Sequence, residues 1–201
     1  MSISIEYNQK EQNVIIMTNL LKMLNRRGLI DDWEKILKSL DSEIKMTTPI
    51  SIKTKSGDMM INITDLELKS ISSGSQMDEF LNLKPEIHKI VVFNVIAKKV
   101  VKQVNTEYKN VEFFFRTEMM EDVPLKKFIP EHQLLDEDYK KELLSKFSEQ
   151  ELGKIFISDF MSRYYGAKVG DIFRIIRPSI TSGQNIYYRK VINSSWDILF
   201  D

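Results

Sequence analysis

The chain has 201 residues, 42% of them hydrophobic, which is enough for one large or two small domains with buried cores. Its 29 basic and 29 acidic side chains cancel, and this balance argues against a free-standing DNA-binding protein, which would carry a positive field. Cysteine is absent, which excludes disulfides and thiolate metal sites. The sequence shows neither an apolar stretch long enough to span a bilayer nor a signal-peptide pattern, so we expect a soluble intracellular protein.

Apolar periodicity in the first part of the chain predicts helices and strands in alternation. The pattern first predicts two helices, over Val14–Leu24, ending at Arg26-Arg27-Gly28, and over Trp33–Leu40. It then predicts a hairpin of Ile50–Lys55 and Met59–Ile63 and a short helix around Phe80 and Leu81. The last three predicted elements are a strand at Lys89–Phe93, a helix at Lys98–Val104 and a strand at Val111–Phe115. The last strand–helix–strand order indicates a parallel pair of strands with a right-handed crossover.

The stretch from Ser158 to Val191 combines aromatic, glycine and cationic residues. Ser158 and Asp159 are suited to cap a helix, and Gly166 is suited to end it in a left-handed conformation. We expect the following strand, Asp171–Arg177, to stop at Pro178, because proline cannot donate to a β-ladder. A turn with Ser179, Thr181, Ser182 and Gly183 then leads to a second strand, Asn185–Ile192, so the pattern predicts a helix followed by a hairpin.

This stretch resembles the C-terminal assembly domain of the fifth subunit shared by eukaryotic nuclear RNA polymerases, a domain that has an archaeal counterpart. The residues that carry the resemblance are Ile129-Pro-Glu-His132, Leu143-Leu-Ser-Lys-Phe147, Arg163-Tyr-Tyr-Gly166, the turn at Gly170, Ile175-Ile-Arg-Pro-Ser179, Thr181-Ser-Gly183 and Tyr188-Arg189. The chain departs from the family at Phe160, where the family usually has proline. A tail from Asn193, with Trp196, Leu199 and Phe200, runs past the point where most members end.

The order of elements in the first part is similar to the jaw domain of the same family. The resemblance implies an α+β protein: an α/β jaw domain with a mixed sheet and flanking helices over residues 1–125, and a small α+β assembly domain over residues 126–201, with an extension from 193. It also implies a non-catalytic subunit of a multisubunit DNA-dependent RNA polymerase, without cofactor, metal or small-molecule ligand. The assembly domain would dock on the largest subunit and contact neighbouring subunits, while the jaw domain would lie near downstream duplex DNA.

Aromatic and arginine side chains are typical of subunit interfaces, because they combine apolar area with directed hydrogen bonds. The residues that the resemblance places at the subunit interface are His132, Arg163, Tyr164, Tyr165, Arg174, Arg177, Pro178, Ser179, Thr181, Tyr188 and Arg189. Of the tyrosine pair, we expect one in the core and the other at the interface. We expect Gly166, Gly170 and Gly183 to serve the backbone of turns.

Lys98, Lys99 and Lys102 are candidates for sequence-independent contacts with the DNA backbone. The alternative is that these three lysines form the ordinary solvated face of a helix, where charged side chains are common.

Two other functions stay open from the residues alone. A metal-dependent nuclease of the jaw-like fold would use a strand-borne carboxylate such as Glu112, although Phe113–Phe115 follow it in place of a lysine. The second open function is that of a transcription adaptor that reuses the docking domain. The abundance of Ile, Lys and Asn fits a polymerase encoded by a large DNA virus, in virions or cytoplasmic factories, and fits the nucleus of an AT-rich eukaryote almost as well.

Overall fold

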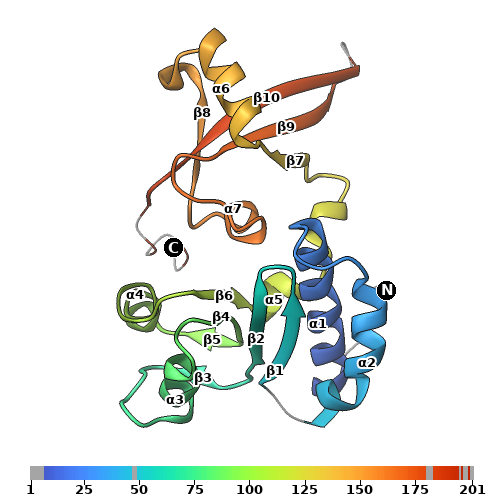
Figure 1. Cartoon of the computed structure of the whole chain (residues 1–201), viewed down its shortest axis with the longest axis vertical. Coiled ribbons are helices and arrows are strands. Elements are labelled where there is room, and N and C mark those ends of the chain that lie inside the picture. Colours follow the sequence, from blue (N-terminus) through green and yellow to red (C-terminus); the bar gives the residue numbers. More distant parts are fainter. Residues whose placement is uncertain (1–6, 47–48, 180–182, 195, 197–198, 200–201) are drawn as a thin grey trace, which may run out of the picture. The chain divides into compact units, whose positions relative to one another are not determined.

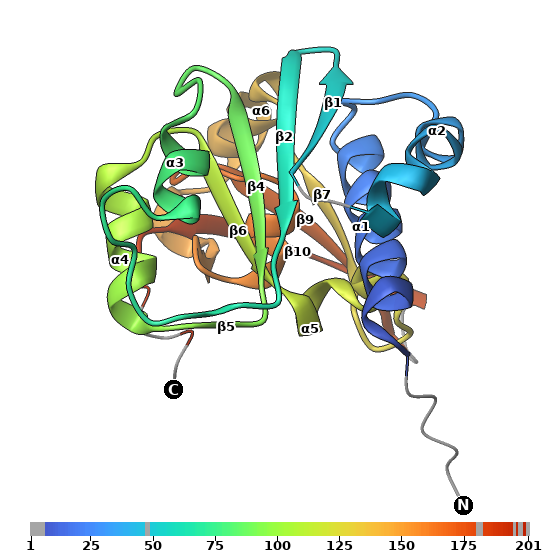
Figure 2. The ribbon, with the colours of Figure 1, turned by 90° about the horizontal axis from the view of Figure 1, so that it is seen from below.

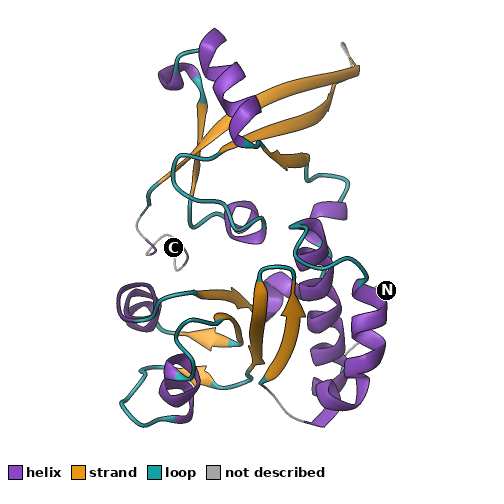
Figure 3. Cartoon of the chain, in the orientation of Figure 1, coloured by secondary structure: helices purple, strands orange, loops and turns teal. Residues whose placement is uncertain are grey.

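The computed structural model describes residues 7–46, 49–179, 183–194, 196 and 199 (Figure 1). The contacts divide the chain into two units, one up to Glu121 and one from Asp122, which we call the jaw unit and the assembly unit. Each unit has its own sheet, and the mixture of helices and strands confirms the predicted α+β class (Figure 3). Across the described residues, every helix is too short or too polar to cross a membrane.

A mixed four-stranded sheet forms the centre of the jaw unit, in the order β1-β2-β4-β6. Its strands are β1 (Ile50–Thr54), β2 (Gly57–Ile63), β4 (His88–Phe93) and β6 (Val111–Phe115). The predicted hairpin is confirmed by the antiparallel pairing of β1 with β2, and the predicted parallel pair by the pairing of β4 with β6. A separate ladder of β3 (Glu67–Leu68) and β5 (Val95–Ile96) was not predicted, because two-residue strands carry no periodicity.

Helices flank both sides of this sheet (Figures 1 and 2). They are α1 (Gln9–Arg26), α2 (Trp33–Met46), α3 (Gln76–Asn82), α4 (Lys98–Glu107) and α5 (Arg116–Met119), and the first four confirm the predicted helices. A capping box begins α1, since Asn8 accepts from the Glu11 N–H and Glu11 accepts from the Asn8 N–H. In both views α1 and α2 lie on one side of the sheet, and α3 and α4 on the other.

One lysine lies fully inside the jaw unit. Lys89, on the central strand β4, is 0% exposed, and its ammonium donates a hydrogen bond of 3.1 Å to the carbonyl of Lys84. Burial lowers the pKa of Lys89, against the opposing influence of Glu86, because a charged ammonium is disfavoured away from water.

The assembly unit has a second four-stranded sheet, in the order β7-β9-β10-β8. Its elements are β7 (Glu131–Leu134), α6 (Glu137–Lys146), β8 (Gly153–Phe156), α7 (Phe160–Tyr164), β9 (Ile172–Ser179) and β10 (Gly183–Ile192), with single 3₁₀ turns at Val123–Leu125 and Glu149–Glu151. The predicted helix followed by a hairpin is confirmed by α7 and the antiparallel pair of β9 and β10. Asp159 caps α7 by accepting from the Met161 N–H.

Side chains alternate between the two faces of this sheet, and a helix covers part of each face. On one face, which we call the α7 face, Phe173, Ile175 and Val191 pack with residues of α7 and its neighbours. On the opposite face, the α6 face, Ile172 and Tyr188 pack with Leu143 of α6.

The prediction that Pro178 stops the strand is wrong, because β9 continues to Ser179 with Pro178 opposite Gln184. The backbone of Ile172 bonds toward β7, where its carbonyl accepts from Leu135, and every second residue of β9 faces the same way. Pro178 therefore faces the β7 side, where the pairing has already ended at Ile176. Proline lacks a backbone N–H, but at this edge no partner strand would accept from it, so the ladder loses no hydrogen bond.

Candidate subunit interface

Several of the predicted interface residues surround a hollow of about 260 Å³ on the α7 face. It is lined by Pro130, His132, Ile175, Arg177, Tyr187 and Arg189. Strand register brings them together, because His132 of β7 and Tyr187 of β10 both lie opposite Ile175 of β9. The guanidinium of Arg177 lies 5.9 Å from the centre of the Tyr187 ring, within the range of a cation–π contact.

The imidazole of His132 lines this hollow on the β7 side. Its Nδ1 lies 2.7 Å from the Pro130 carbonyl, and its ring packs edge-on against Phe173. Burial, assisted by the charge of Arg189, lowers the pKa of His132 below its ordinary value, although the Pro130 bond and Asp159 oppose the shift. His132 is therefore neutral at neutral pH, so that Nδ1 donates to Pro130 and Nε2 is left as an acceptor.

The hollow is lined by two arginines, Arg177 and Arg189. Arg177 and Arg189 are both exposed, and among the described residues neither forms an ion pair with a carboxylate. A guanidinium offers forked donors that fit a carboxylate in two parallel bonds. The hollow is therefore suited to an acidic group supplied by another molecule.

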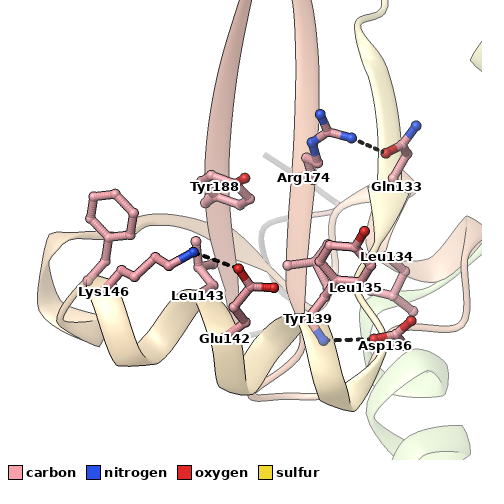
Figure 4. Close-up of a pocket in the computed structure, with 11 residues that line it drawn as sticks. Gln133, Leu134, Leu135, Asp136, Tyr139, Glu142, Leu143, Lys146, Arg174 and Tyr188 are labelled. Atoms are coloured by element: carbon pink, nitrogen blue, oxygen red, sulfur yellow. Dashed lines mark hydrogen bonds and ion pairs between the residues drawn. The ribbon is translucent and has the colours of Figure 1, made fainter.

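Arg174 and Tyr188, also predicted at the interface, lie on the α6 face instead. They line a second pocket, of about 520 Å³, together with residues of α6 (Figure 4). Arg174 donates to the side-chain carbonyl of Gln133 at 3.1 Å, while Glu142 pairs with Lys146 at 2.6 Å and Asp136 caps α6. The predicted interface residues that line these two pockets thus lie on opposite faces of one sheet.

Some of the predicted residues are internal. Arg163 is 9% exposed, its Nε donates to the Ser158 carbonyl, and Tyr164 is 2% exposed, so little of either side chain is left for a partner. The burial of Tyr164 confirms that one tyrosine of the pair lies in the core, while Tyr165 is half-buried. Pro178 is exposed, Ser179 is half-buried, and Thr181 lies outside the described residues.

Backbone angles agree with the predicted role of the three glycines. Gly166, Gly170 and Gly183 have φ values of 63°, 96° and 74°, a region that side chains other than glycine rarely adopt. Tyr187, by contrast, was missed by sequence reasoning, which singled out its neighbour Tyr188.

The three candidate DNA contacts lie on one helix of the jaw unit. Lys98 and Lys99 form the first turn of α4 and Lys102 follows one turn later, and all three are exposed. The N-cap residue, Ala97, supplies no side-chain acceptor there. The three lysines thus lie in the first two turns of α4, near the positive end of its dipole.

Glu112, the carboxylate considered for a nuclease, is already engaged within the jaw unit. Arg27 donates two hydrogen bonds to it, at 2.9 and 2.7 Å, and Nε2 of His88 lies 2.8 Å away. Burial alone would raise the pKa of Glu112, but the bonds from His88 and the charge and bonds of Arg27 outweigh it and lower the pKa to about 2. Within the described part of the chain, His, Asp and Glu side chains form no group of three that could hold a metal ion.

Comparison with known proteins gives consistent matches. Residues 122–191 match the family model described as RNA polymerase Rpb5, C-terminal domain. The DNA-directed RNA polymerase subunit 5 of Acanthamoeba polyphaga mimivirus is 30% identical over 188 residues, which cover 89% of this chain and 91% of the relative. The chain belongs to the RNA polymerase subunit 5 family.

Other family members are cellular. The subunit RPABC1 of DNA-directed RNA polymerases I, II and III from Caenorhabditis briggsae is 31% identical over 134 residues, or 64% of this chain and 62% of the relative. The archaeal subunit Rpo5 from Methanosarcina acetivorans is 42% identical over 66 residues, or 32% of this chain and 85% of the relative. The model match begins where the assembly unit begins, at Asp122, and ends in β10.

Proposed function

We propose that this chain is a non-catalytic subunit of a multisubunit DNA-directed RNA polymerase. In this proposal the assembly unit docks on the largest subunit, and the jaw unit lies near the downstream duplex DNA. The observation that carries it is the match to the mimivirus subunit over nearly the whole of both chains. The carboxylate of Glu112 is bound by Arg27 and His88, which gives no support to the nuclease alternative.

The α7-face hollow is our candidate for the docking contact. Its Tyr187 and its two exposed arginines are residue types enriched at interface centres, where aromatic area and forked donors combine. The match of residues 122–191 to the Rpb5 C-terminal domain supports this choice of unit, because these residues lie within the assembly unit.

The jaw unit would contribute position and a few phosphate contacts. Their exposed position in the first two turns of α4 supports Lys98, Lys99 and Lys102 as those contacts. A compartment follows from the polymerase: the nucleus if the chain is cellular, and virions or cytoplasmic factories if it is viral.

Assembly is tested by co-purification of the tagged chain with the large polymerase subunits. We expect the Arg177→Ala, Arg189→Ala double variant to bind at least about tenfold more weakly, because arginine is enriched among the interface residues whose truncation costs more than about 1 kcal/mol. Arg174→Ala is the matched control, since it removes the same side chain from the opposite face. Equal recovery of the double variant and wild type would show that the hollow is not the docking contact.

DNA contact is tested on the assembled polymerase. The Lys98→Glu, Lys99→Glu variant should assemble normally but lower the salt dependence of downstream-duplex binding by a slope of about two, one for each phosphate contact. Lys109→Glu, an exposed lysine that follows α4, is the control. An unchanged slope would assign the α4 lysines to an ordinary solvated face.

A further inference from the structure

Along part of its length, one edge of β10 has no partner strand in the part of the chain that the structure describes. The neighbour β8 pairs with β10 from Arg189 to Ile192 only, whereas β9 pairs with it from Gly183 to Lys190. Among the described residues, Ile186–Tyr188 therefore pair with a strand on one side only, that of β9.

The backbone of Ile186 points toward that open edge. The Val191 N–H donates to Asp171 and the Val191 carbonyl accepts from Gly170, so Val191 faces the β9 side. Backbone groups alternate along a strand, so Tyr187 also faces β9, whereas Ile186 and Tyr188 face the side of β8. The carbonyl of Ile192 agrees, because it accepts from Ile157, the residue after β8. Strand β8 begins at Gly153, beside Arg189, so the N–H and carbonyl of Ile186 lie before its start. Both groups point outward from the sheet, where an added strand could form hydrogen bonds with them.

The sequence of this edge lacks the features that normally prevent pairing. Natural edge strands carry charged residues, proline or bulges that discourage another strand from adding. The run Gly183-Gln-Asn-Ile-Tyr-Tyr188 contains neither a charge nor a proline. Ile186 and Tyr187 are 46% and 47% exposed, on opposite faces of the sheet. An added strand would therefore gain apolar contacts on both faces as well as backbone hydrogen bonds.

We propose that an extended segment of a neighbouring polymerase subunit adds to the sheet at the Ile186 edge of β10. This inference rests on the proposed function. The side chains of the added strand would alternate between the faces, so one of them would lie beside Tyr187 on the α7 face, next along β10 to Arg189, whose own neighbour on that side is Gly153 of β8. Because Arg177 and Arg189 form no ion pair with a described carboxylate, we assign an acidic residue to that position of the partner strand.

The test removes one backbone donor and leaves the internal ladder intact. Ile186→Pro deletes the N–H that faces the open edge, and we expect the chain to fold but to recover about tenfold less of the large subunits, because a strand that cannot donate pairs poorly. Ile186→Thr controls for the lost side chain, since it keeps the N–H and should recover nearly as much as wild type. Tyr187→Pro, which deletes an N–H that faces β9, should instead unfold the hairpin.

A second measurement needs no variant, and it decides the question if Ile186→Pro fails to fold. Hydrogen exchange at the Ile186 amide should slow at least about tenfold in the assembled polymerase relative to the free chain, because a strand bond protects it. An exchange rate in the polymerase equal to that of the free chain would overturn the inference.

The outcomes separate the two proposals. If the wild-type chain does not co-purify with polymerase, both fail. If wild type and Ile186→Pro co-purify equally and the amide stays unprotected, the edge inference fails while the proposed function stands. If the free chain is a dimer that Ile186→Pro dissociates, a second copy occupies the edge and the inference is overturned.

Discussion

Glu112 joins three segments of the jaw unit that are distant in the sequence. Its carboxylate binds Arg27 just after α1 and His88 at the start of β4, while Glu112 itself lies on β6. Such a network is absent from any local pattern, because the partners are 85 and 24 residues away. Sequence reasoning found Glu112 only as a strand-borne carboxylate and could not assign its partners.

This network predicts acid sensitivity of the jaw unit. The pKa of Glu112 falls from 4.5 to about 2 on folding, so its stabilising effect is fully present above pH 4.5 and is lost as the pH falls toward 2. The shift corresponds to about 3 kcal/mol of unfolding free energy at neutral pH. We expect Glu112→Gln to be destabilised by about that amount at neutral pH, and to match wild type at low pH.

Urea unfolding followed by Trp33 fluorescence measures this difference, in a Trp196→Phe background so that the signal comes from α2. Glu107→Gln, an exposed carboxylate at the end of α4, is the control. A constant gap between Glu112→Gln and wild type across the acid range would contradict the assigned pKa.

Tyr187 shows a similar limit at the residue scale. Two adjacent tyrosines are equivalent in a local pattern, and only the strand register decides that Tyr187 faces the α7 hollow and Tyr188 the α6 pocket. The register depends on pairing between segments that a periodicity argument treats separately.

At the scale of elements, helix α7 depends on how it ends. Gly166 follows the C-cap Tyr165 with a φ of 63°, and its N–H donates to Arg163. We expect Gly166→Ala to lower the unfolding free energy by about 1 kcal/mol, because a β-carbon is strained in the left-handed region. Gly166→Asn should lose less, since asparagine tolerates that region. Thermal unfolding of the two variants provides the measurement, and equal losses would argue against backbone strain as the cause.

Elements with strong apolar periodicity or clear turn residues at their ends were predictable, and short elements were not. The run from Val14 to Leu24 gave α1, and Ser56-Gly57-Asp58 gave the β1–β2 hairpin. Strand β8 has only four residues, and its parallel pairing with β10 brings together residues far apart in the chain. The continuation of β9 through Pro178 depended on where β7 ends, which the local sequence does not contain.

For the whole molecule, the position of the boundary between units has a measurable consequence. The family resemblance implied a break before Lys126, whereas the contacts divide the chain before Asp122. Val123 and Ile129 both pack against the assembly core that includes Ile155 and Phe173. A fragment of residues 122–201 should therefore fold, and should be more stable by about 1 kcal/mol than a fragment of residues 126–201, which loses the partly buried Val123.

Urea unfolding of both fragments, followed by circular dichroism, measures this difference. Equal midpoints would mean that Val123 adds nothing and would favour the later boundary. Family and overall class were accessible from the sequence, because ordered motifs and alternating elements survive without any knowledge of pairing. The division of the predicted interface between two faces was not, since it requires the register of β7, β9 and β10.

The buried ammonium of Lys89 can report on local opening of the sheet in the jaw unit. Amine-reactive reagents modify exposed lysines such as Lys53 directly, but they reach Lys89 only when the central strand β4 separates from its neighbours. The ratio of the two labelling rates, read peptide by peptide in a mass spectrometer, therefore measures the opening equilibrium of the jaw sheet. Because the two lysines belong to the chain itself and no probe has to be built in beforehand, the same ratio can be followed in the free chain and inside a transcribing enzyme.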